Sequence, residues 1–300
     1  HLRLLRAVRF AARLGFSIEP KTFQAMQELA GLVVTVSGER SGDELTRMLT
    51  EQGASRALEL LEESFLLLHA LPEVARMRAV PQPKEFHPEG DVLTHTHLML
   101  AALDEAIACS RRGIARGAEI KADELRGHCQ RDDGDGKWLC FPTAAGQKVL
   151  AWSVLLHDVG KPETISFAER IRFDLHDSKS AEMSARILRR LKRPKRIIDA
   201  VCEIVGKHMR FTHIENMREA KRRRVLQDPL LPFHLELHRI DCVSSHRKME
   251  TYAYVLDAWE KEGVSAGGGG TLYPYRAGTW GPLEADRLLG HDGRSWKEPE

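Results

Sequence analysis

The chain is poor in aromatic residues and lacks both C-x-x-C pairs and long apolar runs. Aromatic residues make up 6% of the 300 residues, and the five cysteines are odd in number. This cysteine usage argues against a disulfide framework. No run approaches the roughly 18 apolar residues that a membrane helix needs, and no secretory leader is visible. We therefore expect reduced thiols, a cytoplasmic location and no membrane partner.

An excess of one charge is also absent, since 45 basic residues stand against 43 acidic ones. The net charge therefore says nothing about binding partners. A hydrophobic content of 42% over this length is enough to build the cores of two domains. Leu, Ala, Arg and Glu dominate, and these residues favour helix over sheet. The composition predicts an all-α fold.

Turn-forming residues divide the chain into parts. The segment PQPKEFHPEG, residues 81–90, holds three prolines and a glycine and predicts a domain boundary. A first helical block is expected over 1–80 and a second over 85–260. A polar, glycine-rich stretch at about 110–146 predicts an inserted loop in the second block, and 261–300 is expected to be a flexible linker and tail.

Apolar residues recur at helical spacing along both blocks. Gly15 is expected to cap the C-terminus of the opening helix, and Ser41 or Asp43 to cap the N-terminus of a later one. The other helices are expected at 20–30, 42–52, 54–68, 92–107, 149–157, 178–191, 195–208, 218–226, 231–244 and 248–259.

Four arginines, Arg3, Arg6, Arg9 and Arg13, follow one stripe of the opening helix. Two interpretations are open. The stripe is either the solvated face of an ordinary amphipathic helix or a row of cations facing phosphate. The second interpretation makes these four arginines candidate RNA- or nucleotide-binding residues.

A histidine and an aspartate are adjacent in the apolar segment LLHDVGKP. Unpaired polar groups in a core are costly, so His157 and Asp158 need a partner, and a divalent metal would satisfy both. A lone histidine on an apolar face is usually a satisfied core residue, but several potential ligands in order favour a metal site. The sequence predicts one or two ions of Mg²⁺, Mn²⁺, Ni²⁺ or another transition metal. The expected ligands are His95, His157, Asp158, His176, His208 and Asp241.

Metal sites of this kind activate water and polarise phosphoryl oxygens. Lys161 follows His157 by one turn and is expected to contact a phosphate, which makes His157, Asp158 and Lys161 the candidate catalytic residues. Gly160 is expected to allow a close approach, and Pro162 to end the helix. The remaining histidines considered are expected to be structural or surface residues: His87, His97, His213, His234, His238 and His246.

Several motifs resemble a known family. LRLLRAVRFAARLGFSIEPKT resembles the neck helix of the bacterial tRNA nucleotidyltransferase (CCA-adding enzyme) and poly(A) polymerase family, and SGERSGDELTRMLTEQGASRALELLEESFLLLHALPEV resembles its body helices. EFHPEGDVLTHTHLML and WSVLLHDVGKPET resemble the HD domain that is fused to many of these enzymes. The resemblance covers about 2–108 and 148–256.

The resemblance implies an all-α protein with a helical neck and body, followed by an HD-type, metal-dependent phosphohydrolase domain. It implies tRNA or another RNA as partner. The parent enzyme would add CMP and AMP to tRNA 3′ ends, and the HD domain would hydrolyse phosphoesters such as 2′,3′-cyclic phosphates or nucleotides.

The family's polymerase head has no counterpart in this sequence. The only D-x-D pair considered, Asp133 and Asp135, lies in a glycine-rich loop without a preceding strand. The chain also begins at His1 inside a helical pattern, so we expect an N-terminal truncation and no polymerase activity from this fragment.

Two other functions stay open. The chain could be a free-standing HD nucleotide phosphohydrolase or phosphodiesterase with a helical adaptor, or a non-catalytic RNA-binding module with a vestigial HD site. Metal content separates the last from the enzymes, and salt-dependent tRNA binding separates an adaptor from an RNA-binding body.

Overall fold

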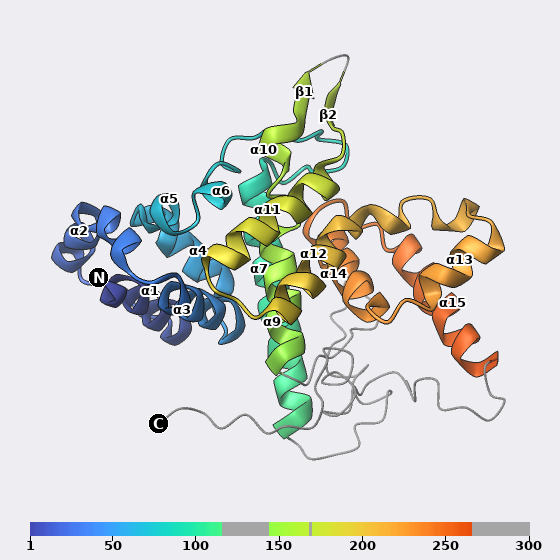
Figure 1. Ribbon diagram of the computed structural model, residues 1–300, viewed down its shortest axis with the longest axis horizontal. Helices are drawn as coiled ribbons and strands as arrows, with labels where there is room; N and C mark the ends of the chain where they lie inside the picture. The colour runs from blue at the N-terminus through green and yellow to red at the C-terminus, as the bar shows by residue number, and fades with distance from the viewer. Residues whose placement is uncertain (116–143, 168–169, 266–300) are drawn as a thin grey trace.

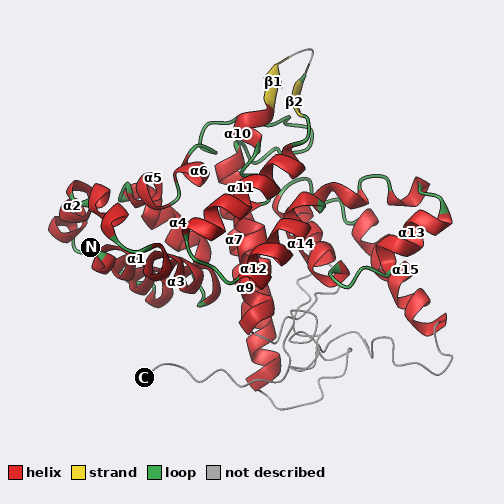
Figure 2. Ribbon diagram, viewed as in Figure 1, coloured by secondary structure: helices red, strands yellow, loops and turns green. Residues whose placement is uncertain are grey.

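The computed structural model describes residues 1–115, 144–167 and 170–265, and these form an elongated array of helices (Figure 1). The expected all-α fold is confirmed, because the described residues contain a single two-stranded sheet beside the helices (Figure 2). No described helix combines the length and the apolar character that crossing a membrane requires.

The first helical block occupies one end of the array (Figure 1). Gly15 ends the first helix in the left-handed conformation, at φ 67°, as its sequence position predicts. The block consists of α1 (Leu2–Leu14), α2 (Pro20–Glu28), the 3₁₀ helix η1 (Ala30–Thr35), α3 (Gly38–Thr50), α4 (Ala54–Glu63), α5 (Leu66–Ala70) and α6 (Pro72–Ala75).

The cap of α3 differs from the prediction. The helix begins at Gly38, and the side chain of Ser37 accepts a hydrogen bond from the backbone N–H of Arg40 at 3.5 Å. The expected caps, Ser41 and Asp43, therefore lie inside the helix. Packing explains the glycine at this start, since a Cβ atom on Gly38 would lie 2.1 Å from the carbonyl oxygen of Arg190.

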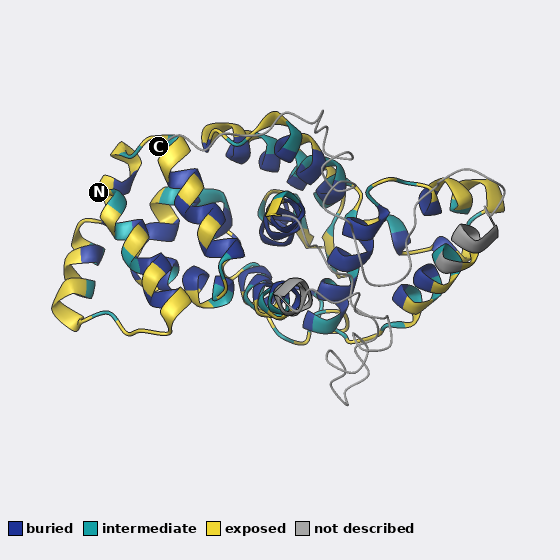
Figure 3. Cartoon of the chain, turned by 90° about the horizontal axis from the view of Figure 1, so that it is seen from below, coloured by how far each residue is buried: buried dark blue, intermediate teal, exposed yellow. Residues whose placement is uncertain are grey.

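The second block is built around α7 (Val92–Ala115) and α9 (Ala144–Leu156), which cross the middle of the molecule in contact with each other (Figure 1). Nearly every residue of α9 is buried, and the burial view shows it enclosed by other helices (Figure 3). The elements around this pair are α10 (Lys161–Thr164), α11 (His176–Arg190), α12 (Lys195–Gly206), η2 (His208–Phe211), η3 (Ile214–Asn216), α13 (Glu219–Leu226), α14 (Leu231–Ser244) and α15 (Glu250–Ser265).

The two blocks share one hydrophobic core. Helix α3 packs on α9, and α4 packs on α7. Polar contacts join the same helices: the indole N–H of Trp152 donates to Thr46 Oγ1 at 3.2 Å, and Asp104 accepts from the backbone N–H of Ala54 at 3.0 Å. The segment 81–90 therefore connects two parts that are packed against each other.

Several predicted boundaries shift. Helix α7 runs to Ala115 and α9 begins at Ala144, so both ends of the expected loop at 110–146 are helical. Helix α15 similarly extends to Ser265, into the expected linker. The rest of both stretches, with Asp133 and Asp135, lies outside the described residues.

The structure also changes the expectation for Pro162. This residue lies in the first turn of α10, where its missing N–H costs nothing, so it begins a helix instead of ending one. The hairpin that follows, β1 (Ile165–Phe167) and β2 (Ile171–Phe173), was not predicted. Its strands are three residues long, which is too short for an alternating pattern to appear.

Candidate metal centre

The structure brings all six predicted ligand residues together at the meeting point of the central helices. His95 comes from α7, Asp241 from α14, and the pair His157–Asp158 from the turn after α9. His176 is the first residue of α11 and His208 the first residue of η2.

Asp158 lies at the centre of this group. Its Oδ2 is 3.1 Å from His157 Nε2, and its Oδ1 is 3.5 Å from His176 Nε2 and 3.8 Å from His208 Nε2. On the other side of His157, the Nε2 atom of His95 lies 3.1 Å from Asp241 Oδ1. The cluster thus joins imidazole nitrogens and carboxylate oxygens, which suit divalent transition metals.

Three of the imidazoles are oriented in the same way. In each, Nδ1 lies within hydrogen-bond distance of the backbone carbonyl three residues earlier: His157 to Val154 at 2.9 Å, His176 to Phe173 at 2.8 Å, and His208 to Val205 at 2.8 Å. A carbonyl oxygen only accepts, so Nδ1 carries the proton and Nε2 keeps its lone pair. The backbone therefore fixes the tautomer in which Nε2 can bind a cation.

The ligand atoms form two sets that share Asp158. One set is His95, His157 and Asp158, and the other is Asp158, His176 and His208; within each set the atoms lie within 4.8 Å of one another. Among the described residues, Asp158 Oδ1 and the Nε2 atoms of His95 and His157 are buried without a hydrogen-bond partner. Such atoms are costly unless something binds them, so these residues fit a divalent metal ion.

The electrostatics of the aspartates favour cation binding. Burial alone would raise the pKa of Asp158, but His157 and Lys161 beside it hold this pKa well below its usual value. The pKa of Asp241 is also lowered, because the contact with His95 outweighs burial. Both carboxylates are therefore ionised at neutral pH, which is the form that binds metal.

The histidines differ from one another. Burial, reinforced by the charge of His176, lowers the pKa of His208 to about 4, so its imidazole is neutral at pH 7. Burial also acts to lower the pKa of His95, but Asp241 and Glu89 together raise it to about 9. A cation at His95 would therefore compete with a proton.

Lys161 does not lie where a substrate phosphate was expected. Its side chain is buried, with 5% of the residue exposed, and its Nζ lies 2.6 Å from Asp158 Oδ2 and donates to Gln82 Oε1 at 2.7 Å. The ammonium group therefore orients the shared carboxylate from inside the protein. The expectation of a phosphate contact is corrected accordingly.

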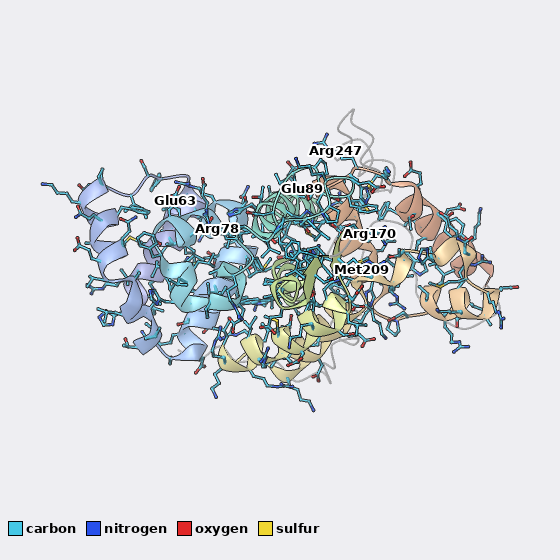
Figure 4. All side chains as sticks on the ribbon, turned by 90° about the horizontal axis from the view of Figure 1, so that it is seen from above. Glu63, Arg78, Glu89, Arg170, Met209 and Arg247 are labelled. Atoms are coloured by element: carbon cyan, nitrogen blue, oxygen red, sulfur yellow. The ribbon has the colours of Figure 1, made fainter. Side chains whose placement is uncertain are left out.

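Two further residues, Glu89 and His87, belong to the cluster and were missed as functional residues. Glu89 Oε1 lies 2.7 Å from His95 Nδ1 and 2.9 Å from His87 Nδ1, and the three residues form another set of potential ligands. Figure 4 labels Glu89 over the centre of the molecule. Their place just before His95, in EFHPEGDVLTHT, was an available signal.

Asp91 holds this segment in place. Its carboxylate accepts from the backbone N–H of Thr94 at 2.7 Å, which caps α7, and from that of Ala79 at 2.9 Å. His97 points elsewhere, with its Nε2 3.5 Å from Glu62 Oε2 on α4, as expected for a structural residue.

The arginine stripe of α1 is largely engaged inside the molecule. Arg6 and Arg9 contact Glu44 at 2.9 and 2.7 Å, while Arg9 and Arg13 contact Glu51 at 3.1 and 3.3 Å. Only 5% of Arg9 is exposed, so this residue cannot meet an RNA phosphate. Arg3, Arg6 and Arg13 remain exposed. The contacts of Arg6, Arg9 and Arg13 join α1 to α3, and RNA binding by the exposed arginines of the stripe stays a prediction.

Comparison with known proteins gives a family match in each block. Residues 15–77 match the family described as the probable RNA and SrmB-binding site of polymerase A, and residues 136–245 match the HD domain family. The HD match begins after His95, yet the fold brings His95 to the other ligands.

Individual relatives are consistent with these matches. A multifunctional CCA protein from Aromatoleum aromaticum is 31% identical over 210 residues, covering 69% of this chain and 42% of that protein. Another multifunctional CCA protein, from an Azoarcus species, is 26% identical over 270 residues, covering 89% of this chain and 53% of that protein. An A-adding tRNA nucleotidyltransferase from Deinococcus radiodurans is 29% identical over 266 residues, covering 85% and 52%. The chain spans about half the length of the curated relatives it matches.

Proposed function

The chain belongs to the bacterial tRNA nucleotidyltransferase and poly(A) polymerase family, and we propose that its HD domain is a metal-dependent phosphohydrolase. One observation carries the proposal. Three histidines, one of them buried and two partly buried, have their Nδ1 atoms engaged by backbone carbonyls, and their Nε2 atoms converge on the buried carboxylate of Asp158. A packing role alone does not require this convergence.

Two groups of side chains would hold the ions. His95, His157, Asp158 and Asp241 would hold one, and Asp158, His176 and His208 would hold a second. A bound divalent ion supplies Lewis acidity and lowers the pKa of a coordinated water. Side chains of the protein would orient the ligands: Lys161 orients Asp158, and Glu89 orients His95 from its Nδ1 side.

The proposed substrates are phosphoesters of nucleotides, such as 2′,3′-cyclic phosphates, and the proposed partner is tRNA or another RNA. The match of residues 15–77 to an RNA-binding family supports an RNA partner. The names of the relatives support a place in the processing of tRNA 3′ ends, with this chain as the C-terminal portion of a CCA-adding-type enzyme.

The test combines metal content with hydrolysis. The purified chain, stripped with chelator and reloaded with Mn²⁺, Ni²⁺ or Mg²⁺, should hydrolyse bis-p-nitrophenyl phosphate and 2′,3′-cyclic AMP. Asp158→Asn should lose both bound metal and activity, whereas Asp199→Asn, at an exposed position on α12, should keep both. Full metal occupancy in Asp158→Asn would contradict the site. A chain that neither binds metal nor hydrolyses these substrates would instead favour a non-catalytic RNA-binding module, and metal binding without hydrolysis would contradict the proposed activity on them.

A further inference from the structure

A separate pocket adjoins the metal centre along the chain. The short helix η2 carries His208 into the centre, and its next two residues, Met209 and Arg210, line a cavity of about 580 Å³. Asn216, Met217, Arg218 and Lys221, from η3 and the start of α13, form much of the remaining wall. Figure 4 labels Met209 near the middle of the molecule.

The charge of this pocket is positive. Its lining includes Arg210, Arg218 and Lys221 and no acidic residue. Arg210 is held by Asp228 at 2.6 Å. Arg218 and Lys221 are exposed, and neither has an acidic partner among the residues that the structure describes. They are three positions apart, so both face the same side of the turn that begins α13, as two contacts to one anionic ligand require.

The pocket also has an apolar surface. Met209 is 45% exposed although it lies beside a buried histidine, and Met217 contributes a second thioether. Methionine side chains are flexible and polarisable, so they adapt to flat apolar groups such as nucleobases. The cavity volume lies within the range of about 300–1,000 Å³ that is typical of small-ligand sites. The cations can contact a phosphate, and the apolar surface beside them can contact a base. This combination is typical of a nucleotide-binding site.

We propose that this pocket binds a nucleotide of a single-stranded RNA, next to the phosphoester that the HD site would hydrolyse. The inference deepens the proposed function and rests on it for the position of the reacting phosphate. It assigns the site an RNA end as its substrate in preference to small phosphoesters. It also places an RNA contact in the HD domain, apart from the family match at residues 15–77.

Binding without turnover tests the pocket directly. In EDTA, fluorescence anisotropy of a short labelled RNA should show about tenfold weaker binding to the full chain carrying R218A and K221A. The slope of log affinity against log salt should fall by about 0.7 for each lost phosphate contact. The control carries R224A and K195A, which removes two exposed cations outside the pocket. Equal losses in both variants, or no loss in either, would overturn the proposal.

Two further measurements separate this pocket from its alternatives. Met209→Ser should weaken RNA binding without changing the salt slope, because it removes apolar contact and no charge. Polyglutamate that displaces RNA from the wild-type chain at equal charge concentration would indicate an acidic protein partner and overturn the RNA assignment.

Hydrolysis assays distinguish the two proposals. In metal-loaded protein, R218A with K221A should raise KM for an RNA ending in a cyclic phosphate by a larger factor than KM for bis-p-nitrophenyl phosphate. If no substrate is hydrolysed while RNA binding still depends on the pocket, the proposed activity fails and the pocket stands as an RNA site.

Discussion

At the scale of single residues, Glu89 is the side chain whose contribution to the candidate metal centre can be tested most selectively. It touches His95 at Nδ1 and leaves Nε2 to the cluster. Glu89→Gln should lower metal affinity about 10- to 100-fold, because carboxylates behind histidine ligands orient them and raise their basicity. Competition with a chelator of known affinity measures the change. Glu85→Gln, at an exposed position in the same segment, should bind metal like the wild type.

Glu44 makes a residue-scale prediction about stability. Burial would raise its pKa, but Arg9 and Arg6 lower it below the usual 4.5. Glu44→Gln removes the negative charge that compensates the buried guanidinium of Arg9. The substitution should lower the free energy of unfolding by about 3 kcal/mol at pH 7. A carboxylate whose pKa is lowered in the folded protein stabilises the fold at pH values above its pKa in the unfolded chain. This stabilisation is lost as the pH falls through the pKa of the folded protein. The difference in the free energy of unfolding between Glu44→Gln and the wild type should therefore shrink below pH 4.5.

Urea denaturation followed by circular dichroism at pH 7 and at pH 3.5 measures this effect. Glu28→Gln, at an exposed position on α2, should change stability by less than about 0.5 kcal/mol. A Glu44→Gln penalty that is the same at both pH values would show that the arginine contacts do not cause it.

Residue identity alone predicted part of this chemistry. The six ligand positions could be chosen because histidine or aspartate within an apolar helical pattern is unusual enough to need a partner. Glu89 escaped notice because a glutamate in a proline-rich segment is normally solvated, and only the return of that segment over α7 brings it to His95. The contacts of Lys161 with Gln82 and of Arg9 with Glu44 could not be predicted for a related reason: these partners are far away in sequence.

At the scale of elements, the contact between the start of α10 and the start of α11 positions the second set of ligands. Gly160 donates its backbone N–H to Ser180 Oγ at 2.9 Å, and a Cβ atom there would lie 2.6 Å from Ser180 N and 2.9 Å from the His176 carbonyl. The glycine expected to allow a close approach therefore allows the approach of α11.

Gly160→Ala should push α11 outward, cost about 1–3 kcal/mol and lower metal stoichiometry by displacing His176. Thermal unfolding and elemental analysis are the measurements. Gly31→Ala is the matched control, since its new Cβ would meet only His69 at 3.8 Å. If Gly160→Ala is less stable but binds as much metal as the wild type, then the contact between Gly160 and α11 supports packing and does not place the metal ligands.

Helix positions followed from periodicity more reliably than helix ends did. Helix α14 has the predicted bounds, because its apolar residues fill its length and a proline opens it. Helix α3 starts earlier than predicted, at the Ser37 cap, and Gly38 and Gly42 then pack against the end of α11 and the turn after it. The partner in that contact belongs to the other block, so no local sequence pattern predicts it.

At the scale of the whole molecule, the shared core predicts that both blocks unfold together. Gly38→Ala would place a Cβ atom 2.1 Å from the Arg190 carbonyl and force the blocks apart. Hydrogen exchange should then show faster opening of α1 and α3 relative to α9, whereas the wild type and Gly31→Ala should protect both blocks alike. Equal protection in Gly38→Ala would mean that the contact between the blocks does not couple them.

The continuous core also predicts that the N-terminal block, which matches an RNA-binding family, responds to a metal bound at the candidate site. A ligand that binds only the folded state stabilises everything that unfolds with its site, by about 2.7 kcal/mol when its concentration is 100 times Kd. Because α3 packs on α9 and α4 on α7, the midpoint temperature of the N-terminal helices should rise with the concentration of the cognate ion, although those helices provide none of its ligands. The concentration of that ion in the cell would then influence how much of the N-terminal block is folded at any moment.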